Sequence, residues 1–187
     1  MDAFSYLSVL LSIIIGLAMT QVLLGYRALL LSRSRVRLYW PVLLWSALIL
    51  ILATQNWWSS FGLAEHESWT FPVFATILLQ TILLYMMAGL VLPDIPPGEP
   101  VDLEAHYYRE VTPFFAIMLA MLAVSVVKDL LLDGHLPEGE NLAFHGLFAA
   151  VALAALLTRR PRLHELLPPL MVVATGVYIA LLFARLG

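Results

Sequence analysis

The chain has 187 residues, of which 61% are hydrophobic and only 12% are charged. Soluble domains usually carry about 25% charged residues, and a soluble fold of this size could not bury so much apolar surface. The net charge of −3 argues against a nucleic acid as partner. The absence of cysteine excludes disulfides, thiolate metal sites and cysteine catalysis. The composition therefore predicts an integral membrane protein.

Six stretches have the length and apolar character of transmembrane helices, which need roughly 20 residues to cross about 30 Å of hydrocarbon. They cover approximately 4–31, 39–58, 71–92, 112–132, 141–158 and 166–186. The first lacks a basic start and is too long for a secretory signal, so we expect it to remain in the mature protein. We expect an all-α protein with one transmembrane domain over 1–187, folded as a compact bundle. The fifth stretch is short and the fourth ends in charges, so a five-span or re-entrant arrangement is the alternative.

Arginine gathers on one side of the predicted membrane. The loops after the first, third and fifth spans carry Arg27, Arg33, Arg35, Arg37, Arg109, Arg159, Arg160 and Arg162, and the other side has only Lys128 and Arg185. Because cytoplasmic loops are enriched in Lys and Arg, this predicts that both termini lie outside. It also predicts contact with anionic lipid headgroups near Arg33, Arg35, Arg37, Arg159, Arg160 and Arg162.

Small residues recur at four-residue spacing in three spans. The three sets are Ser8, Ser12, Gly16 and Thr20; Gly146, Ala150 and Ala154; and Gly176, Ala180 and Ala184. Helices in lipid associate through such faces, so we expect the fifth and sixth spans to pack ridge to ridge, or the chain to form a homo-oligomer. Two halves of three spans would form an inverted repeat, for which the residue matches are weak.

Polar side chains at membrane depth are the first functional candidates, because they are costly there. Gln80 either lines a pathway or hydrogen-bonds a neighbouring helix, and Gln21 is a second pathway candidate. Lys128 and Asp129 are adjacent, about 100° apart on a helix, so we expect them not to pair with each other. They either reach the interface or form an ion-coupled site.

His145 is the remaining candidate within a span. It is interpreted as a packing residue, or as a haem ligand or proton relay. No second histidine falls in a predicted span, so no cofactor is predicted.

The segment from Asp102 to Glu110 is the densest polar cluster in the loops. If it is helical, Asp102, His106 and Arg109 share a face and could perform acid–base chemistry on a lipid headgroup, or bind a metal. No hydrolase, kinase, zinc or phosphate-loop signature accompanies them, so no metal is predicted. The alternative is an interfacial helix with tyrosine anchors.

Four stretches resemble a family of uncharacterised bacterial six-helix inner-membrane proteins. They are Arg35-Val36-Arg37-Leu38-Tyr39-Trp40-Pro41, Asn56-Trp57-Trp58, Trp69-Thr70-Phe71 and Thr158-Arg159-Arg160-Pro161-Arg162. The resemblance covers nearly the whole chain. It implies a bacterial inner-membrane protein of the same topology and carries no activity.

Three functions remain open from the sequence. The first is a small ion or solute channel or transporter that uses Gln21, Gln80, Lys128, Asp129 and His145. The second is a membrane-embedded enzyme that acts on lipid through Asp102, His106 and Arg109. The third is an accessory subunit that binds a partner through a small-residue face. The chain is almost entirely membrane-embedded, and this favours the first.

Overall fold

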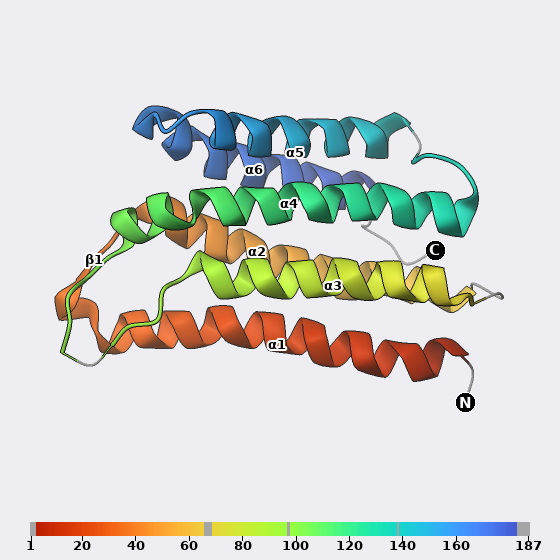
Figure 1. Ribbon diagram of the computed structural model, residues 1–187, viewed down its shortest axis with the longest axis horizontal. Helices are drawn as coiled ribbons and strands as arrows, with labels where there is room; N and C mark the ends of the chain where they lie inside the picture. Colours follow the sequence, from red (N-terminus) through yellow and green to blue (C-terminus); the bar gives the residue numbers. More distant parts are fainter. Residues whose placement is uncertain (1–2, 66–68, 97, 138, 183–187) are drawn as a thin grey trace.

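The computed structural model describes residues 3–65, 69–96, 98–137 and 139–182 (Figure 1). Within them lie six α-helices that are long and apolar enough to cross a membrane, which confirms the predicted all-α bundle. The helices are α1 (Ala3–Leu31), α2 (Trp40–Ser59), α3 (Phe71–Val91), α4 (Leu103–Asp133), α5 (Gly139–Leu157) and α6 (Pro161–Leu182). Short 3₁₀ turns follow α1 and α2, at Arg33–Arg35 and Ser60–Glu65.

Two helices begin earlier than the sequence pattern predicted. The polar segment before the fourth span continues into it without a break, so α4 has 31 residues and contains Pro113. Its start is fixed by Asp102, whose side chain accepts hydrogen bonds from the backbone amides of Glu104 and Ala105. The sixth helix begins at Pro161, which places Pro168 and Pro169 inside the helix rather than in its first turn. The fifth helix has 19 residues, about 28 Å at 1.5 Å per residue, and is long enough to span.

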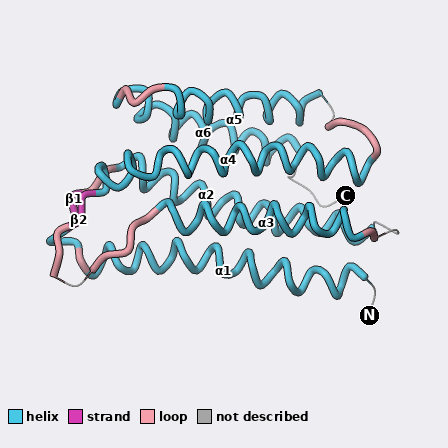
Figure 2. The backbone as a smooth tube through the Cα atoms, in the orientation of Figure 1, coloured by secondary structure: helices cyan, strands magenta, loops and turns pink. Residues whose placement is uncertain are grey.

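The helices lie side by side, and successive helices run in opposite directions (Figure 1). At one end α1 begins and α6 ends, and we call this the terminal end. The connections α1–α2, α3–α4 and α5–α6 lie at the opposite end, which we call the arginine end (Figure 2). These three connections and the flanking helix turns carry the eight arginines that the sequence placed on one side.

Aromatic packing fills the arginine half of the bundle. Trp45 of α2 is only 2% exposed and makes edge-to-face contacts with Phe114 and Phe115 of α4, at centroid distances of 5.7 and 5.3 Å. Leu84 and Met87 of α3 are each 1% exposed and belong to the same buried cluster. Apolar side chains therefore close this half of the bundle.

The small-residue faces point away from the neighbouring helices. Gly146 and Ala150 on α5 are exposed, and so are Gly176 and Ala180 on α6, while Ala184 lies outside the described residues. A Cβ atom added at Gly146 or Gly176 would meet nothing within 4 Å. The expectation that these helices pack ridge to ridge is therefore wrong. Larger side chains make the contact instead: the rings of Phe144 and Phe148 on α5 lie 5.2 and 5.9 Å from the ring of Tyr178 on α6.

Two very short strands join distant connections at the arginine end. Val36–Arg37 (β1) and Val101–Asp102 (β2) pair in parallel, with Val36 opposite Val101 and Arg37 opposite Asp102 (Figure 2). The three-helix halves are not packed alike. In the first half α1 lies along α3, whereas the close contacts of α6 are with α2 and α5. This packing does not display the weak inverted repeat that the sequence suggested.

Helix α1 approaches the end of α3 closely at Gly25. A Cβ on Gly25 would lie 2.6 Å from Cδ1 and 3.0 Å from Cβ of Leu92. We expect Gly25→Ala to lower the free energy of unfolding by about 1–3 kcal/mol through overpacking. The penalty should shrink in a Leu92→Ala background, as a double-mutant cycle of thermal unfolding in detergent would show.

Gly89→Ala on α3 is the matched control, because nothing lies within 4 Å of its added Cβ. It should leave stability unchanged or raise it by about 0.5–1 kcal/mol through helix propensity. Equal losses at both glycines would contradict the assigned contact with Leu92.

Candidate functional site

A polar cavity of about 780 Å³ opens between the helices in the terminal half of the bundle. Every helix contributes to its wall, including Ile15 of α1 and Ile77 of α3. Exposed residues at the end of α4 and in the α4–α5 connection, such as Asp133 and His135, also line it, so the cavity reaches the surface at the terminal end. Its volume lies within the range of about 300–1,000 Å³ typical of small-molecule sites.

The hydrogen-bonding groups of the wall come from five helices. They include Gln55, Asn56 and Ser59 of α2, Gln80 of α3, Ser125, Lys128 and Asp129 of α4, Asn141 of α5 and Tyr178 of α6. The Tyr178 hydroxyl donates to Oδ1 of Asn141 at 3.4 Å, which ties the ends of α5 and α6 together. Amide, hydroxyl and charged groups thus surround one space inside an otherwise apolar bundle.

Lys128 and Asp129 pair inside this cavity, contrary to the expectation from their adjacent positions. Nζ of Lys128 lies 3.3 Å from Oδ1 of Asp129, and the two side chains are 25% and 15% exposed. The four methylenes of lysine let the ammonium reach around the helix to its neighbour, although the Cβ directions diverge. The pair therefore faces the cavity, not the outer interface.

One or two turns beyond the wall residues, each helix carries a buried apolar side chain, and we call this layer between the cavity and the arginine end the floor. These side chains are Ala18, Ile49, Leu84, Met118, Phe148 and Met171, all buried. Below them lies the aromatic packing around Trp45. The cavity is therefore closed towards the arginine end.

Two of the predicted pathway residues lie outside the cavity wall. Gln21 on α1 is exposed, and its Nε2 donates to the Tyr85 hydroxyl of α3 at 3.1 Å. His145 is buried on α5, and its Nδ1 lies 2.9 Å from the backbone oxygen of Asn141, one turn earlier. Gln80, Lys128 and Asp129 thus share the cavity wall. Gln21 instead bonds to a neighbouring helix, and His145 bonds to the backbone of its own helix.

The residues proposed for lipid chemistry make structural contacts at the arginine end. His106 is buried, with Nε2 donating to the Leu90 carbonyl at 3.0 Å and Nδ1 accepting from Arg109 at 3.1 Å. The crevice beside it has a volume of about 10 Å³, at most enough for one water. Asp102 does not join His106 and instead caps α4. The crevice is too small for a lipid substrate. A catalytic role for Asp102, His106 and Arg109 therefore stays a prediction.

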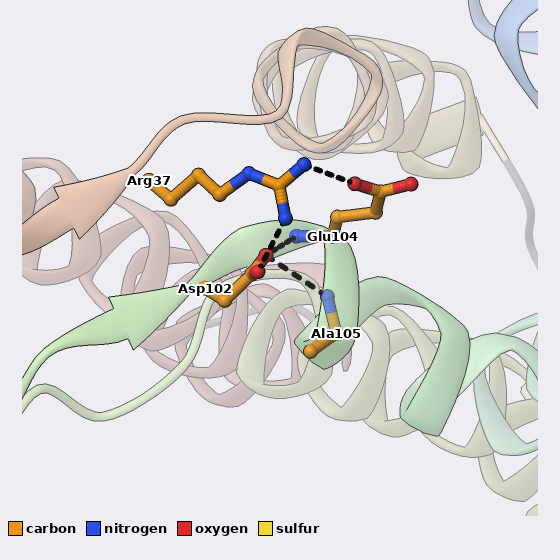
Figure 3. A network of polar contacts seen from close by, with 4 residues as sticks. All are labelled: Arg37, Asp102, Glu104 and Ala105. Atoms are coloured by element: carbon orange, nitrogen blue, oxygen red, sulfur yellow. Dashed lines mark hydrogen bonds and ion pairs between the residues drawn. The ribbon is translucent and has the colours of Figure 1, made fainter.

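Arg37 and Asp102 form a clasp between the strands (Figure 3). The guanidinium of Arg37 contacts Asp102 at 2.8 Å and Glu104 at 3.1 Å. Partial desolvation would raise the pKa of Asp102, but hydrogen bonds from the Ala105 amide, Arg37 and the Glu104 amide outweigh it and lower that pKa. The clasp thus ties the α1–α2 connection to the start of α4.

Two substitutions at Asp102 should separate its role as the cap of α4 from its role as the ion-pair partner of Arg37. Asp102→Ala loses cap and ion pair, and we expect a loss of about 1 kcal/mol in the free energy of unfolding. Asp102→Asn keeps a good cap and should lose less. Because folding lowers this pKa, the ionised carboxylate stabilises the protein above its unfolded pKa of about 3.9. That advantage over Asp102→Asn should vanish as the pH falls through the folded pKa, as thermal unfolding at several pH values would show.

Sequence reasoning missed His164, because α6 begins earlier than predicted and contains it. His164 is completely buried; its Nε2 donates to the Thr158 carbonyl at 2.7 Å, and its Nδ1 accepts from the Tyr107 hydroxyl at 2.8 Å. It therefore joins α4, α6 and the end of α5. Both ring nitrogens make hydrogen bonds within the protein. His164 therefore has a structural role, with no nitrogen available to bind a ligand.

The expectation that no second histidine lies in a span is corrected by His106 in α4 and His164 in α6. Within the described residues, no group of three or more His, Asp or Glu side chains could hold a metal. Comparison of the chain with family models, with curated proteins and with solved structures finds no match. The cavity geometry is therefore the basis for a functional assignment.

Proposed function

We propose that this protein is a membrane carrier that binds a small polar solute in the cavity of its terminal half. The observation that carries the proposal is the convergence of Gln80, Lys128 and Asp129 on one solute-sized space inside the bundle. Ionisable residues within membrane helices are costly and usually mark a substrate or ion pathway. Here they are accompanied by amide and hydroxyl groups from four other helices.

The closed floor favours a carrier over an open channel. A channel needs a continuous polar path, whereas Leu84, Met118 and the packing around Trp45 block the arginine half with buried apolar side chains. Carriers bind their substrate in a cavity that is open to one side at a time, near the middle of the membrane. The cavity has the form of one such state, open at the terminal end.

The arginine end is assigned to the cytoplasm of a bacterial inner membrane. Eight arginines gather there, and Lys128 is the one Lys or Arg among the described residues of the terminal half. Arg33, Arg160 and Arg162 are exposed and available to anionic headgroups, whereas Arg37 is engaged by Asp102 and Glu104. The cavity then opens to the outside.

Single-cysteine labelling tests this orientation, because the chain has no native cysteine. Ser34 and Gly62 are exposed at the arginine end and the terminal end, respectively. In intact cells, a membrane-impermeant maleimide should label Gly62→Cys but label Ser34→Cys only after permeabilisation. The reverse pattern would overturn the orientation.

Solute flux into proteoliposomes tests the carrier assignment. Wild-type protein should transport at least one small polar solute or ion above the rate of empty liposomes. Asp129→Asn and Gln80→Ala, which alter the cavity wall, should each reduce that flux by about tenfold or more. Gln21→Ala is the matched control outside the cavity and should retain it. Absence of binding and flux across ions, sugars, polyols and amino acids would reject the proposal.

A further inference from the structure

The ion pair in the cavity wall indicates the chemistry of the solute. Among the described residues, Asp129 is the one carboxylate within ion-pair distance of Lys128, at 3.3 Å. Arg37 and Arg109 approach their acidic partners more closely, at 2.8 Å. Because adjacent side chains diverge on a helix, Lys128 and Asp129 meet only through Nζ and Oδ1. Only Oδ1 of Asp129 is within ion-pair distance of the ammonium, which has three donors in all, so both groups have capacity for a further partner.

The charges of the cavity change from the mouth to the interior. At the mouth, Asp133 and Glu140 are exposed and carry two negative charges. Deeper, Lys128 and Asp129 are mostly buried and sum to zero. The mouth therefore disfavours an anion. A net cation could reach the interior but would leave Lys128 without a compensating charge.

Apolar side chains share the same space. Leu11 and Ile15 of α1 and Ile77 of α3 line the wall near the polar groups. A ligand that fits therefore combines one positive group, one negative group and an apolar body. Such a ligand is neutral overall, so its passage moves no net charge through the membrane.

We propose that the solute is a zwitterion with an apolar body, of the α-amino acid class, held by exchange of the Lys128–Asp129 ion pair. Lys128 would bind the carboxylate of the ligand, and Asp129 would bind its ammonium. On binding, Lys128 and Asp129 each exchange their mutual ion pair for an ion pair with the ligand. Neither charge is then left unpaired inside the cavity. This inference rests on the proposed carrier function and specifies its substrate class.

Three matched probes test this assignment with the full chain in detergent. They are leucine, its amide leucinamide, which is a cation, and N-acetylleucine, which is an anion. Isothermal titration calorimetry should show leucine binding at least about tenfold more tightly than either derivative. Lys128→Gln and Asp129→Asn should each weaken leucine binding by about tenfold or more. Asp94→Asn removes an exposed carboxylate at the arginine end, outside the cavity wall; it is the control and should change leucine binding less than about threefold.

The ligand preference within each variant separates recognition from misfolding. In Lys128→Gln, leucinamide should bind no more weakly than leucine, because the partner for the carboxylate is gone. In Asp129→Asn, N-acetylleucine should bind no more weakly than leucine. A wild type that prefers leucinamide, a polyol or an inorganic cation would overturn the zwitterion assignment and leave the carrier function standing. Absence of binding and of flux for every solute would overturn both.

Discussion

A cysteine in place of Ser125 is expected to react rapidly with a charged, membrane-impermeant methanethiosulfonate added from outside. Ser125 is a half-buried residue of the cavity wall on α4. The reacting species is the thiolate, which forms in water and not in hydrocarbon. A water-filled cavity should therefore allow reaction at this depth. The rate of modification, followed by mass spectrometry, should exceed that of a lipid-facing cysteine by about 100-fold or more.

Ser12→Cys is the matched control, because Ser12 is exposed on α1 next to Leu11, which lines the cavity at the same level. Its side chain faces the surroundings of the bundle, so its thiol should stay almost unreactive in the membrane. The adduct on Ser125→Cys should also reduce solute flux, and bound solute should slow its formation. Equal rates at the two positions would show that the cavity holds no continuous water.

Replacing His164 is expected to cause the largest loss of stability in the chain. His164→Ala removes a ring that is completely buried and leaves the Tyr107 hydroxyl and the Thr158 carbonyl without this partner. The loss of packing and the unsatisfied groups should together lower the free energy of unfolding by about 3 kcal/mol or more. Thermal unfolding in detergent should shift down by about 6–12 °C.

Two further variants show which part of the effect comes from hydrogen bonds. His164→Phe keeps a ring and loses the polar contacts, so it should cost about half as much as His164→Ala. His135→Ala changes an exposed histidine and should stay within about 0.5 kcal/mol of wild type. If His164→Phe were as stable as wild type, the hydrogen bonds to Tyr107 and Thr158 would have no net role.

The sequence was a good guide to the number of helices, because hydrocarbon thickness imposes a length that composition alone reveals. It was a weaker guide to boundaries at the arginine end. Helices α4 and α6 continue past the apolar stretch, so the change from polar to apolar residues did not mark the helix start. His164 was missed for this reason.

Lateral contacts were harder to infer than helix positions. The spacing of Gly146 and Gly176 identified a face of each helix but not what lies against it, and the structure leaves both faces exposed. The sequence did identify Lys128 and Asp129 as candidates, because charged side chains are costly at membrane depth. Their pairing was not, because helix geometry fixes Cβ directions while a lysine side chain bends freely. Tyr178 and Asn141 lie in the cavity wall because of tertiary packing, which the sequence pattern does not predict.

The clasp between Arg37 and Asp102 has a consequence for the order of assembly during synthesis. Its two halves are 65 residues apart in the chain, and three helices precede the second half. At about 5–20 residues per second, several seconds pass between their emergence from the ribosome. In the proposed orientation, the arginines of the α1–α2 loop favour its cytoplasmic placement during that interval, before the clasp can form. Once β1 and β2 pair, the α1–α2 loop is held beside the α3–α4 loop, so an inverted hairpin could not complete the bundle.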